Sequence, residues 1–536
     1  MQVNPPTSKT KRTFPKRRRR LRTHAYAANV RRPRLEILES RRVLSGFGTV
    51  ATDTYPVATH DQYLTLEDSV VSRNMVTDDT GRGSDTSGPD GLPLIVTEIN
   101  GQSYQPATPV TLPSGASLAV TPSGDFVYDP TTSPVLGSID TGAAAENDAF
   151  DYTVATGYSD IIVFGDSLSD VGNLFAISGD TYPPYPLYWE GRVSNGPVWA
   201  EHLATRLNLE STPENNYAVA GAMTGHGNFN EGRPDYDLPD DLPGLQDEVA
   251  QFAAGLAGGT ADPDALYVVW AGPNNFFNPP ADPPAAIAQA VGEIVTAVGT
   301  LSYFGADHIV VLNMPDLGIT PEGLASGMGS LLTGFSQGFN GALHGALQAY
   351  SPDAIEFDVF TAFQQIVAAP DTFGLADVTQ ACFDGTGVCA NPNEYLFWDA
   401  VHPTTKGHQV LADLIFEQLV TLEPLANSDT ATVNISVSDV TTPVAFVDDH
   451  LYVGGTSGRD CIRLVPQRGD EVYVYANATR LGSFHLQPDA RAVVFGHAGD
   501  DLLTAERMSR SVILHGGDGN DCLHGGRHDD ILHGGS

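Results

Sequence analysis

The chain has 536 residues with 65 acidic and 28 basic side chains, which gives a formal net charge of −37 at pH 7. A chain of this length exceeds what one hydrophobic core organises, so we expect several domains. Half of the basic residues lie within residues 1–46, and the remainder is strongly acidic. Because such a surface repels nucleic acid and anionic membranes, the composition excludes a nucleic-acid-binding protein.

Residues 1–46 are a basic tail that contains a run at residues 16–20 and a later stretch, residues 34–45. The tail lacks the apolar middle region of an ordinary signal peptide. No stretch of the chain reaches the roughly 18 apolar residues of a membrane span. The later stretch, with Leu35-Glu36, Arg41 and Leu44-Ser45, resembles an N-terminal motif that one group of bacteria places on exported proteins. The resemblance implies an extracellular or cell-surface protein; the alternative is a disordered basic tail.

Residues 47–157 have the pattern of short strands separated by turns. The expected strands are residues 94–97, 111–112, 118–120, 126–128 and 150–154. The runs around Asp61-Gln62-Tyr63 and Gly124-Asp125-Phe126 resemble those of bacterial cadherin-like or Ig-like surface modules. This resemblance implies an all-β sandwich and association with a cell surface or matrix.

The last strand of this sandwich is expected far along the chain. In the modules that it resembles, a final strand closely follows the equivalent of residues 150–154, but here the chain enters a different domain. A matching strand occurs at residues 429–437, within residues 427–440. We therefore predict that the intervening domain is inserted into the last hairpin, because exposed turns tolerate insertion. The alternative is two adjacent modules joined by an ordinary linker strand.

Residues 158–425 alternate between buried-strand and helical patterns. The expected strands are residues 161–164, 265–270, 308–312 and 355–359; the expected helices begin at Pro197 or lie near residues 284–303, 321–350 and 404–420. This alternation predicts an α/β domain with a doubly wound parallel sheet and helices on both faces. Ligands of such sheets bind beyond the carboxyl ends of the strands.

Gly165-Asp166-Ser167 follows the first of these strands directly, so Ser167 faces the ligand-binding end of the sheet. A serine hydroxyl is a weak nucleophile that needs an adjacent base. His402 is the candidate base, and Asp399, three residues earlier, is close enough to accept the second imidazole N–H. Asp166 is expected to be a structural carboxylate that accepts nearby backbone N–H groups.

An oxyanion forms when a carbonyl is attacked, and it needs hydrogen-bond donors held in place. Gly221 lies in a run of small residues, so its backbone N–H can approach a ligand closely. Asn274 follows the strand at residues 265–270 and offers a side-chain amide. Both are therefore candidate oxyanion donors.

These residues, in this order, resemble the GDSL/SGNH hydrolases over residues 158–425, with a further match at residues 191–199. The lipase, phospholipase and acyltransferase branch is the most similar. The resemblance implies a flavodoxin-like fold, Ser167 as nucleophile, His402 as base and Asp399 as its orienting partner. It also implies an oxyanion hole of the Ser167 N–H, Gly221 and Asn274, and no cofactor for catalysis. The sequence departs from the family at Asn275, where the family has Asp, which leaves the hydrogen bonding around Asn274 open.

Four cysteines are present. Cys382 and Cys389 lie seven apart across a Gly-containing turn, and a disulfide between them would fit an oxidising compartment. Cys461 and Cys522 lie in a different region, and their pairing does not follow from the sequence.

Residues 443–536 are β-rich in pattern and end in glycine- and aspartate-rich nonapeptides that start at Gly516 and Gly525. These resemble hemolysin-type calcium-binding repeats, which form a parallel β-roll. The resemblance implies a short C-terminal β-roll in which Asp518, Asp521 and Asp530 contribute oxygen ligands to calcium beside backbone carbonyls. The alternative is a flexible Gly/Asp-rich tail.

The leading prediction is a secreted serine ester hydrolase that acts on small-molecule or lipid esters. A second is a polysaccharide O-deacetylase, because the same scaffold hosts that activity. A third is an adhesion or matrix protein with an inactive hydrolase domain. Four aromatic residues either line an apolar acyl pocket or belong to the core: Tyr182, Tyr185, Tyr188 and Trp189.

Overall fold

The computed structural model of the chain describes residues 56–67, 69–88, 91–136, 139, 145–233, 238–278, 280–422, 424–438, 444–447, 450–487 and 490–535. Contacts between Cα atoms divide the chain into residues 1–52 and residues 53–536. The predicted export tail, residues 1–46, lies outside the described residues.

Two four-stranded sheets make up the first β region. One has the strand order β1-β14-β7-β3 and the other β2-β6-β5-β4. The strands are β1 (Asp61–Leu66), β2 (Val71–Asn74), β3 (Leu94–Ile99), β4 (Val110–Thr111), β5 (Ser117–Val120), β6 (Asp125–Asp129), β7 (Glu146–Thr156) and β14 (Ser428–Ser438). Large aromatic side chains from both sheets, such as Tyr63, Phe126 and Phe150, are buried in one shared cluster. This burial holds the two sheets together.

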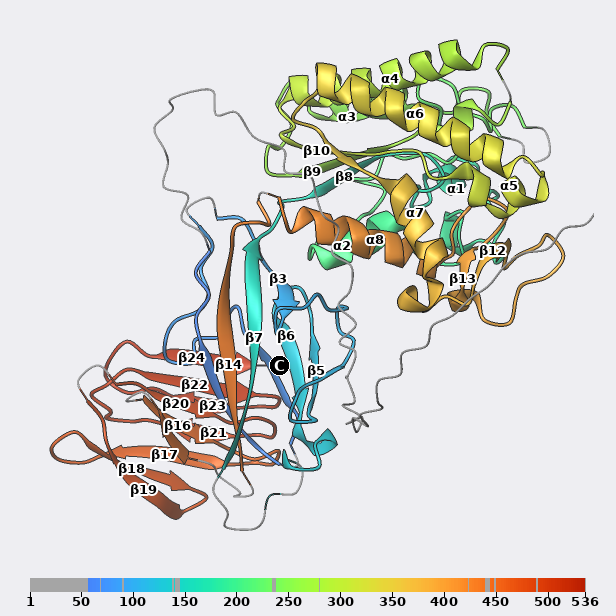
Figure 1. Cartoon of the computed structure of the whole chain (residues 1–536). Helices are drawn as coiled ribbons and strands as arrows, with labels where there is room; N and C mark the ends of the chain where they lie inside the picture. The colour runs from blue at the N-terminus through green and yellow to red at the C-terminus, as the bar shows by residue number, and fades with distance from the viewer. Residues whose placement is uncertain are drawn as a thin grey trace, which may run out of the picture. The chain divides into compact units, whose positions relative to one another are not determined.

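β14 pairs with β7 along its whole length, although more than 270 residues separate the two strands in sequence. The antiparallel register runs from Ser428 opposite Ala155 to Val437 opposite Glu146. On its other edge β14 is parallel to β1. Figure 1 shows β7 in cyan and β14 in orange side by side. Both ends of the intervening domain therefore leave one sheet from adjacent strands.

The intervening α/β domain has a parallel four-stranded sheet of order β11-β10-β9-β8. Its strands are β8 (Ile161–Gly165), β9 (Leu266–Trp270), β10 (His308–Leu312) and β11 (Ile355–Phe357), and a separate parallel pair is β12 (Asp377–Ala381) and β13 (Tyr395–Phe397). Its helices are α1 (Asn173–Ile177), α2 (Trp199–Arg206), α3 (Leu245–Gly255), α4 (Pro283–Phe304), α5 (Pro321–Ala325), α6 (Gly329–Tyr350), α7 (Val359–Ala368) and α8 (Thr405–Leu419).

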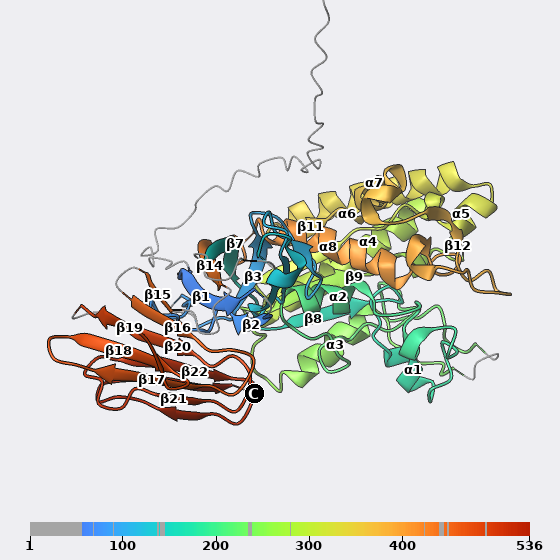
Figure 2. The same ribbon diagram turned by 90° about the horizontal axis from the view of Figure 1, so that it is seen from below.

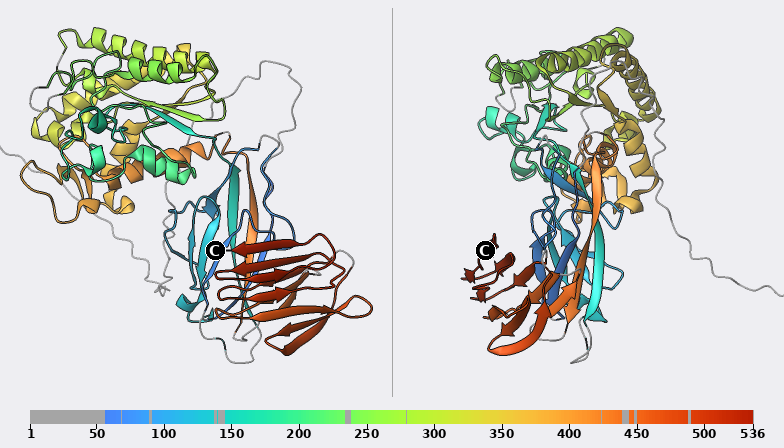
Figure 3. Two further views of the ribbon diagram at one scale, coloured as in Figure 1. Left: turned by 180° about the vertical axis from the view of Figure 1, so that it is seen from behind. Right: turned by 90° about the vertical axis from the view of Figure 1, so that its left-hand side faces the viewer.

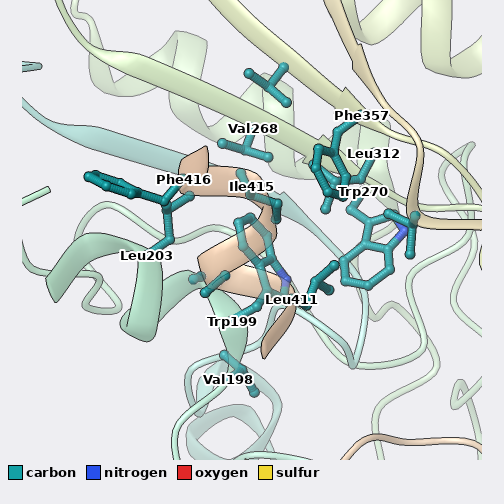
Figure 4. Packing of buried hydrophobic residues seen from close by; sticks show 14 of the residues in the cluster. Val198, Trp199, Leu203, Val268, Trp270, Leu312, Phe357, Leu411, Ile415 and Phe416 are labelled. Atoms are coloured by element: carbon teal, nitrogen blue, oxygen red, sulfur yellow. The ribbon is translucent and has the colours of Figure 1, made fainter. Parts of the chain in front are cut away.

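Helices cover both faces of this sheet because its strand side chains alternate between two cores. Val268, Trp270 and Leu312 pack against α2 and α8, whereas Tyr267, Val269 and Val311 pack against α3, α4 and α6. Figure 1 shows α3, α4 and α6 above the sheet and α2 and α8 below it, and Figure 2 views the lower side. In Figure 4 the side chains of α2 and α8 meet Val268 and Trp270 beneath the strands.

Three predicted element boundaries were wrong. The strand predicted over residues 355–359 ends at Phe357, because the Asp358 side chain accepts the Thr361 N–H and caps α7. The helix predicted over residues 321–350 is broken into α5 and α6, and Gly327 between them has a φ of +70°. The helix expected from Pro197 begins at Trp199.

Among the described residues, α4 is long and apolar enough to cross a membrane by length and composition alone. Within the domain, however, Val291, Ile294, Val298 and Leu301 of this helix are buried against the sheet and its neighbouring helices. Its apolar face thus serves the core of the α/β domain.

The C-terminal region has two sheets, of order β15-β16-β20-β22-β24 and β19-β18-β17-β21-β23, and from β19 onward successive strands alternate between them. The strands are β15 (Val444–Val447), β16 (His450–Gly454), β17 (Cys461–Pro466), β18 (Glu471–Ala476), β19 (Thr479–His485), β20 (Ala492–Phe495), β21 (Leu502–Thr504), β22 (Val512–Gly517), β23 (Cys522–His524) and β24 (Ile531–Gly535). The ladders from β16 through β20 and β22 to β24, and from β17 through β21 to β23, are parallel. The left view of Figure 3 shows these strands, in orange to red, stacked on one another.

We predict that Ile435→Ala in β14 lowers the free energy of unfolding by about 2–5 kcal/mol, because the Ile435 side chain is fully buried in the sandwich core. Thermal or urea unfolding measures the change. Asn434→Ala, at an exposed position of the same strand, is the control and should change little. Equal stability of the two variants would contradict the role of β14 as a core strand.

Candidate active site

Ser167 lies directly beyond the carboxyl end of β8. The preceding Gly165 has a φ of +152°, and a Cβ atom there would lie 2.2 Å from the carbonyl oxygen of Trp270. Only glycine allows this close approach of the β8 end to β9. The turn leaves the Ser167 side chain partly exposed, while Asp166 beside it is 1% exposed.

Asp399 and His402 follow β13, which belongs to the separate β12–β13 pair and not to the main parallel sheet. Two backbone contacts close this turn. The Trp398 N–H donates to the His402 carbonyl oxygen (2.8 Å), and Phe397 forms an isolated antiparallel β-bridge with Pro403. The neighbouring loop is closed by a disulfide between Cys382 and Cys389. Within the described residues Cys461 and Cys522 are both free.

Ser167, His402 and Asp399 form one hydrogen-bonded series. His402 Nε2 lies 2.9 Å from Ser167 Oγ, and His402 Nδ1 lies 2.9 Å from both carboxylate oxygens of Asp399. The His402 and Asp399 side chains are 18% and 16% exposed. Asp399 Oδ1 also accepts the N–H groups of Val401 (3.0 Å) and His402 (2.8 Å), which orient the carboxylate.

The electrostatics of this series favour an imidazolium next to a carboxylate. Burial alone would raise the pKa of Asp399, but the charge of His402 and the hydrogen bonds that Asp399 accepts lower it to about 2. Burial would lower the pKa of His402, but the charge and hydrogen bond of Asp399, with a further contribution from Asp166, raise it above its usual value. This arrangement suits a base that takes a proton from Ser167.

Two backbone N–H groups near Ser167 are available to an oxyanion. Among the hydrogen bonds of the described residues, the N–H groups of Ser167 and Gly221 have no protein acceptor. Gly221 has a φ of +90°, and a Cβ atom there would lie 2.4 Å from side-chain atoms of Asn228 and Asn230. The position therefore requires glycine.

Asn274 lies beyond β9 and is 5% exposed. Its Nδ2 amide donates to Asp166 Oδ2 and to the Ala222 carbonyl oxygen, both at 3.1 Å. The amide thus ties the Ser167 turn to the segment that carries Gly221. A role for Asn274 as an oxyanion donor stays a prediction, because it requires one of these acceptors to be exchanged for substrate. Burial raises the pKa of Asp166 to about 6, and Leu168 N–H donates to its other oxygen.

The hydrogen bonds of Asn275 to Thr224 explain why an amide stands at this position, where the family has Asp. Its Nδ2 donates to Thr224 Oγ1 (2.8 Å), and its Oδ1 accepts the Thr224 N–H (3.0 Å). Thr224 Oγ1 in turn donates to Glu293 Oε2 (2.5 Å). Because the hydroxyl has one proton, which Glu293 receives, its other neighbour must be a donor. An amide at position 275 meets this requirement and a carboxylate does not.

Glu248 is a buried residue that the sequence analysis missed. It projects from α3, is fully buried, and its two oxygens accept the N–H groups of Gly165 (2.8 Å) and Val219 (3.1 Å). Burial raises its pKa well above the usual value, and the nearby Asp166 and Asp170 add to the rise. The spacing of Leu245, Val249 and Phe252 puts Glu248 on the apolar face of α3, which is the signal that could have revealed it.

The aromatic residues near the site have different environments. Tyr182 and Tyr188 are partly buried and pack against one small apolar cluster, whereas Tyr185 is 67% exposed. The Tyr188 hydroxyl donates a hydrogen bond to Asp399 Oδ2 (2.9 Å). The guanidinium of Arg192 lies over the Trp189 ring, 4.8 Å from its centroid. Tyr188 therefore contacts the candidate site through a polar bond that its sequence position does not reveal.

The three predicted calcium ligands do not form a cluster. Asp530 accepts the N–H groups of Val512 (3.0 Å) and Gly526 (2.6 Å), and Asp521 Oδ1 accepts that of Asp501 (2.9 Å). The backbone N–H of Asp518 donates to the carbonyl oxygen of His497. In the part of the chain that the structure describes, no group of three or more His, Cys, Asp or Glu side chains is arranged to hold a metal ion.

One feature of this region still fits a cation. Asp521 Oδ2 is buried without a hydrogen-bond partner among the described residues, and a Cβ atom on Gly516 would lie 2.3 Å from it. The glycine thus allows this carboxylate oxygen to lie close to the Gly516 backbone. Backbone carbonyls would have to supply most of the remaining ligands.

The comparisons with known proteins find relatives of the α/β domain. Residues 161–415 match the family of GDSL-like lipases and acylhydrolases. An uncharacterized protein of Pseudomonas putida from the trpE-trpG intergenic region is 30% identical over 287 residues, 49% of this chain and 48% of that protein. The phosphatidylcholine-sterol acyltransferase of Aeromonas hydrophila is 27% identical over 304 residues, 48% of this chain and 88% of that protein. Esterase EstA of Pseudomonas aeruginosa is 29% identical over 309 residues, 49% of this chain and 47% of that protein.

Residues 161–415 of the chain are thus similar to GDSL-like lipases and acylhydrolases. It spans about half the length of the P. putida protein and of EstA. A solved structure of a member of the lipolytic protein G-D-S-L family from Veillonella parvula, 16% identical, covers 49% of this chain and 99% of its own with a TM-score of 0.29. That score is too low to inform on function.

We predict that Glu248→Leu lowers kcat for an ester substrate about tenfold, because the buried Gly165 N–H loses its carboxylate acceptor and the Val219 N–H keeps only the Gly165 carbonyl oxygen. Steady-state kinetics measures the change. Glu248→Gln keeps one acceptor oxygen for the Gly165 N–H, while the Val219 N–H keeps the Gly165 carbonyl oxygen, and it should restore part of kcat. A folded Leu variant with the kcat of the unmodified protein would contradict this role.

Proposed function

We propose that this protein is a secreted serine ester hydrolase that acts on acyl esters, including lipid esters. The observation that carries the proposal is the series from Ser167 Oγ to His402 Nε2, and from His402 Nδ1 to Asp399, at 2.9 Å in each step. The names of the relatives, an acyltransferase of phosphatidylcholine and an esterase, support an acyl ester as substrate. The Cys382–Cys389 disulfide supports an oxidising, extracellular compartment.

In the proposed reaction Ser167 Oγ attacks the ester carbonyl carbon while His402 Nε2 takes the hydroxyl proton. The resulting oxyanion accepts the N–H groups of Ser167 and Gly221, and Asp399 stabilises the imidazolium. The tetrahedral intermediate then expels the alcohol, which receives the proton from His402, and leaves an acyl group on Ser167. Water, deprotonated by His402, attacks this acyl group in the same way and releases the carboxylic acid.

Ser167→Ala tests the proposal. The variant removes the attacking oxygen but leaves the fold, so hydrolysis of an aryl ester should fall by about 10⁴-fold or more. Release of the aryl alcohol measures the rate, and circular dichroism checks the fold. Turnover that is unchanged in this variant would contradict Ser167 as nucleophile.

The alternatives give different results with the unmodified protein. A lipolytic esterase turns over long-chain acyl esters, whereas a polysaccharide O-deacetylase prefers acetylated glycans over them. An adhesion or matrix protein with an inactive domain hydrolyses none of these substrates. Turnover compared on short acyl esters, long acyl esters and acetylated glycans therefore separates the three.

We also propose that calcium stabilises the C-terminal region through Asp521. The buried and unpartnered Asp521 Oδ2 supports this proposal. Calcium at a hundredfold excess over its Kd would add about 2.7 kcal/mol to the stability of a folded state that alone binds it. Calcium should therefore raise the Tm of the full chain, as scanning calorimetry measures, and Asp521→Asn should remove the rise. A Tm of the unmodified protein that calcium leaves unchanged would contradict the proposal.

A further inference from the structure

The hydrogen bonds around Asp399 differ between its two oxygens. Oδ1 accepts two backbone N–H groups of its own turn, whereas Oδ2 accepts the hydroxyl of Tyr188 at 2.9 Å. Tyr188 lies 211 residues away in sequence. The second oxygen is thus oriented by a side chain from another segment of the domain.

Tyr188 is held by an aromatic cluster that we define as Tyr188, Phe383 and Trp398. The Tyr188 ring lies edge-on to Phe383 and to Trp398, with centroid distances of 6.3 and 6.5 Å. Phe383 stacks on Trp398 at 5.9 Å. Trp398 directly precedes Asp399, so the cluster joins the hydroxyl donor and its acceptor through packed rings.

The Cys382–Cys389 disulfide closes the loop that carries Phe383. Around it, the Cys382 N–H donates to the Phe397 carbonyl oxygen (3.0 Å), and the Phe383 N–H donates to that of Trp398 (2.6 Å). The disulfide loop therefore lies along the strand that leads to Asp399. It restricts the Phe383 ring to the face of Trp398, and the Tyr188 ring lies edge-on to both rings.

We propose that Tyr188 is a positioning residue for the reaction, which rests on the proposed function above. Its hydroxyl fixes Asp399 Oδ2 and offsets part of the carboxylate charge, and the aromatic cluster and the disulfide hold that hydroxyl in place. The Tyr188 O–H does not touch the reacting ester. It acts through Asp399 on the proton affinity and orientation of His402.

Loss of the Tyr188 hydroxyl is expected to change the pH dependence of the hydrolysis rate. Asp399 and Asp166 raise the pKa of His402 and so favour its imidazolium, and Tyr188 acts on Asp399. The buried His408 lies nearby, and its own pKa is lowered by burial and by the charges of His202 and His402. When the Tyr188 hydroxyl is removed, the Asp399 charge is less compensated and stabilises the imidazolium more strongly. The pKa of His402 then rises, and because the base must be neutral, the acid limb of the rate profile moves to higher pH.

Tyr188→Phe tests the proposal, because it keeps the ring packing and removes only the hydroxyl. For an aryl ester we expect kcat to fall about tenfold, since a hydrogen bond to a charged group is lost, with KM nearly unchanged. The acid limb of kcat/KM should move to higher pH. Tyr350→Phe, at a 77% exposed position on α6, is the control for loss of a tyrosine hydroxyl and should keep the unmodified profile.

A double variant, Cys382→Ala with Cys389→Ala, tests whether the disulfide holds the aromatic cluster in place. It should shift the acid limb in the same direction by a smaller amount. A Tyr188→Phe profile that superimposes on that of the unmodified protein, or a change in KM alone, would overturn the proposal and assign Tyr188 to substrate contact or to packing. Failure of the proposed function is distinguishable, because the unmodified protein would then hydrolyse no ester.

Discussion

Buried carboxylates that accept backbone N–H groups hold the turn of Ser167 in place, and the geometry of the candidate site depends on them. Asp170, fully buried, accepts N–H groups from Gly172, Asn173 and Leu174 of its own loop and from Ala220 of another. Glu248 joins Gly165 to Val219. These bonds connect the segment that carries Ser167 with the segment that carries Gly221. Removing one such acceptor would leave a buried N–H group without a partner.

The same hydrogen bonds connect the chain segments that carry the N–H groups of Ser167 and Gly221. Ser167 follows β8, and Gly221 follows a segment in which Asn216 bridges Val163 of β8. Asn274 adds a bond from the β9 side to Asp166, so three separate segments meet around one turn. His402 then approaches from the β13 side, in a turn closed by its own backbone contacts. The site is thus preorganised by backbone hydrogen bonding before any ester binds.

The residues that could be predicted from the sequence are those whose roles show in short local patterns. Asp399 and His402 stand three residues apart, Ser167 follows a buried strand, and Gly221 lies in a run of small residues, so each of these roles can be predicted without a tertiary contact. β14 was predicted because its pattern completes a sheet that lacked a strand, and it pairs with β7. Glu248 and the hydroxyl of Tyr188 act across long separations in sequence, which no local pattern encodes.

In the C-terminal region the sequence predicts the repeating strands better than the contacts of the aspartate side chains. Glycine and aspartate spacing predicted a repeating β structure, and from β19 to β24 successive strands do alternate between two sheets. The three aspartates named as ligands do not gather, because the carboxylates of Asp521 and Asp530 accept N–H groups from neighbouring strands or turns. Sequence spacing gives the position of a carboxylate along a repeat, but not whether its oxygens face an ion or the backbone.

The central claim is that Ser167 is a nucleophile activated by His402. Labelling with a fluorophosphonate, followed by mass mapping of the peptides, tests it most directly because the probe reacts with an activated serine hydroxyl. The account predicts a single adduct on Ser167 that forms far more slowly in His402→Ala. An unmodified Ser167, or labelling that His402→Ala leaves unchanged, would contradict it.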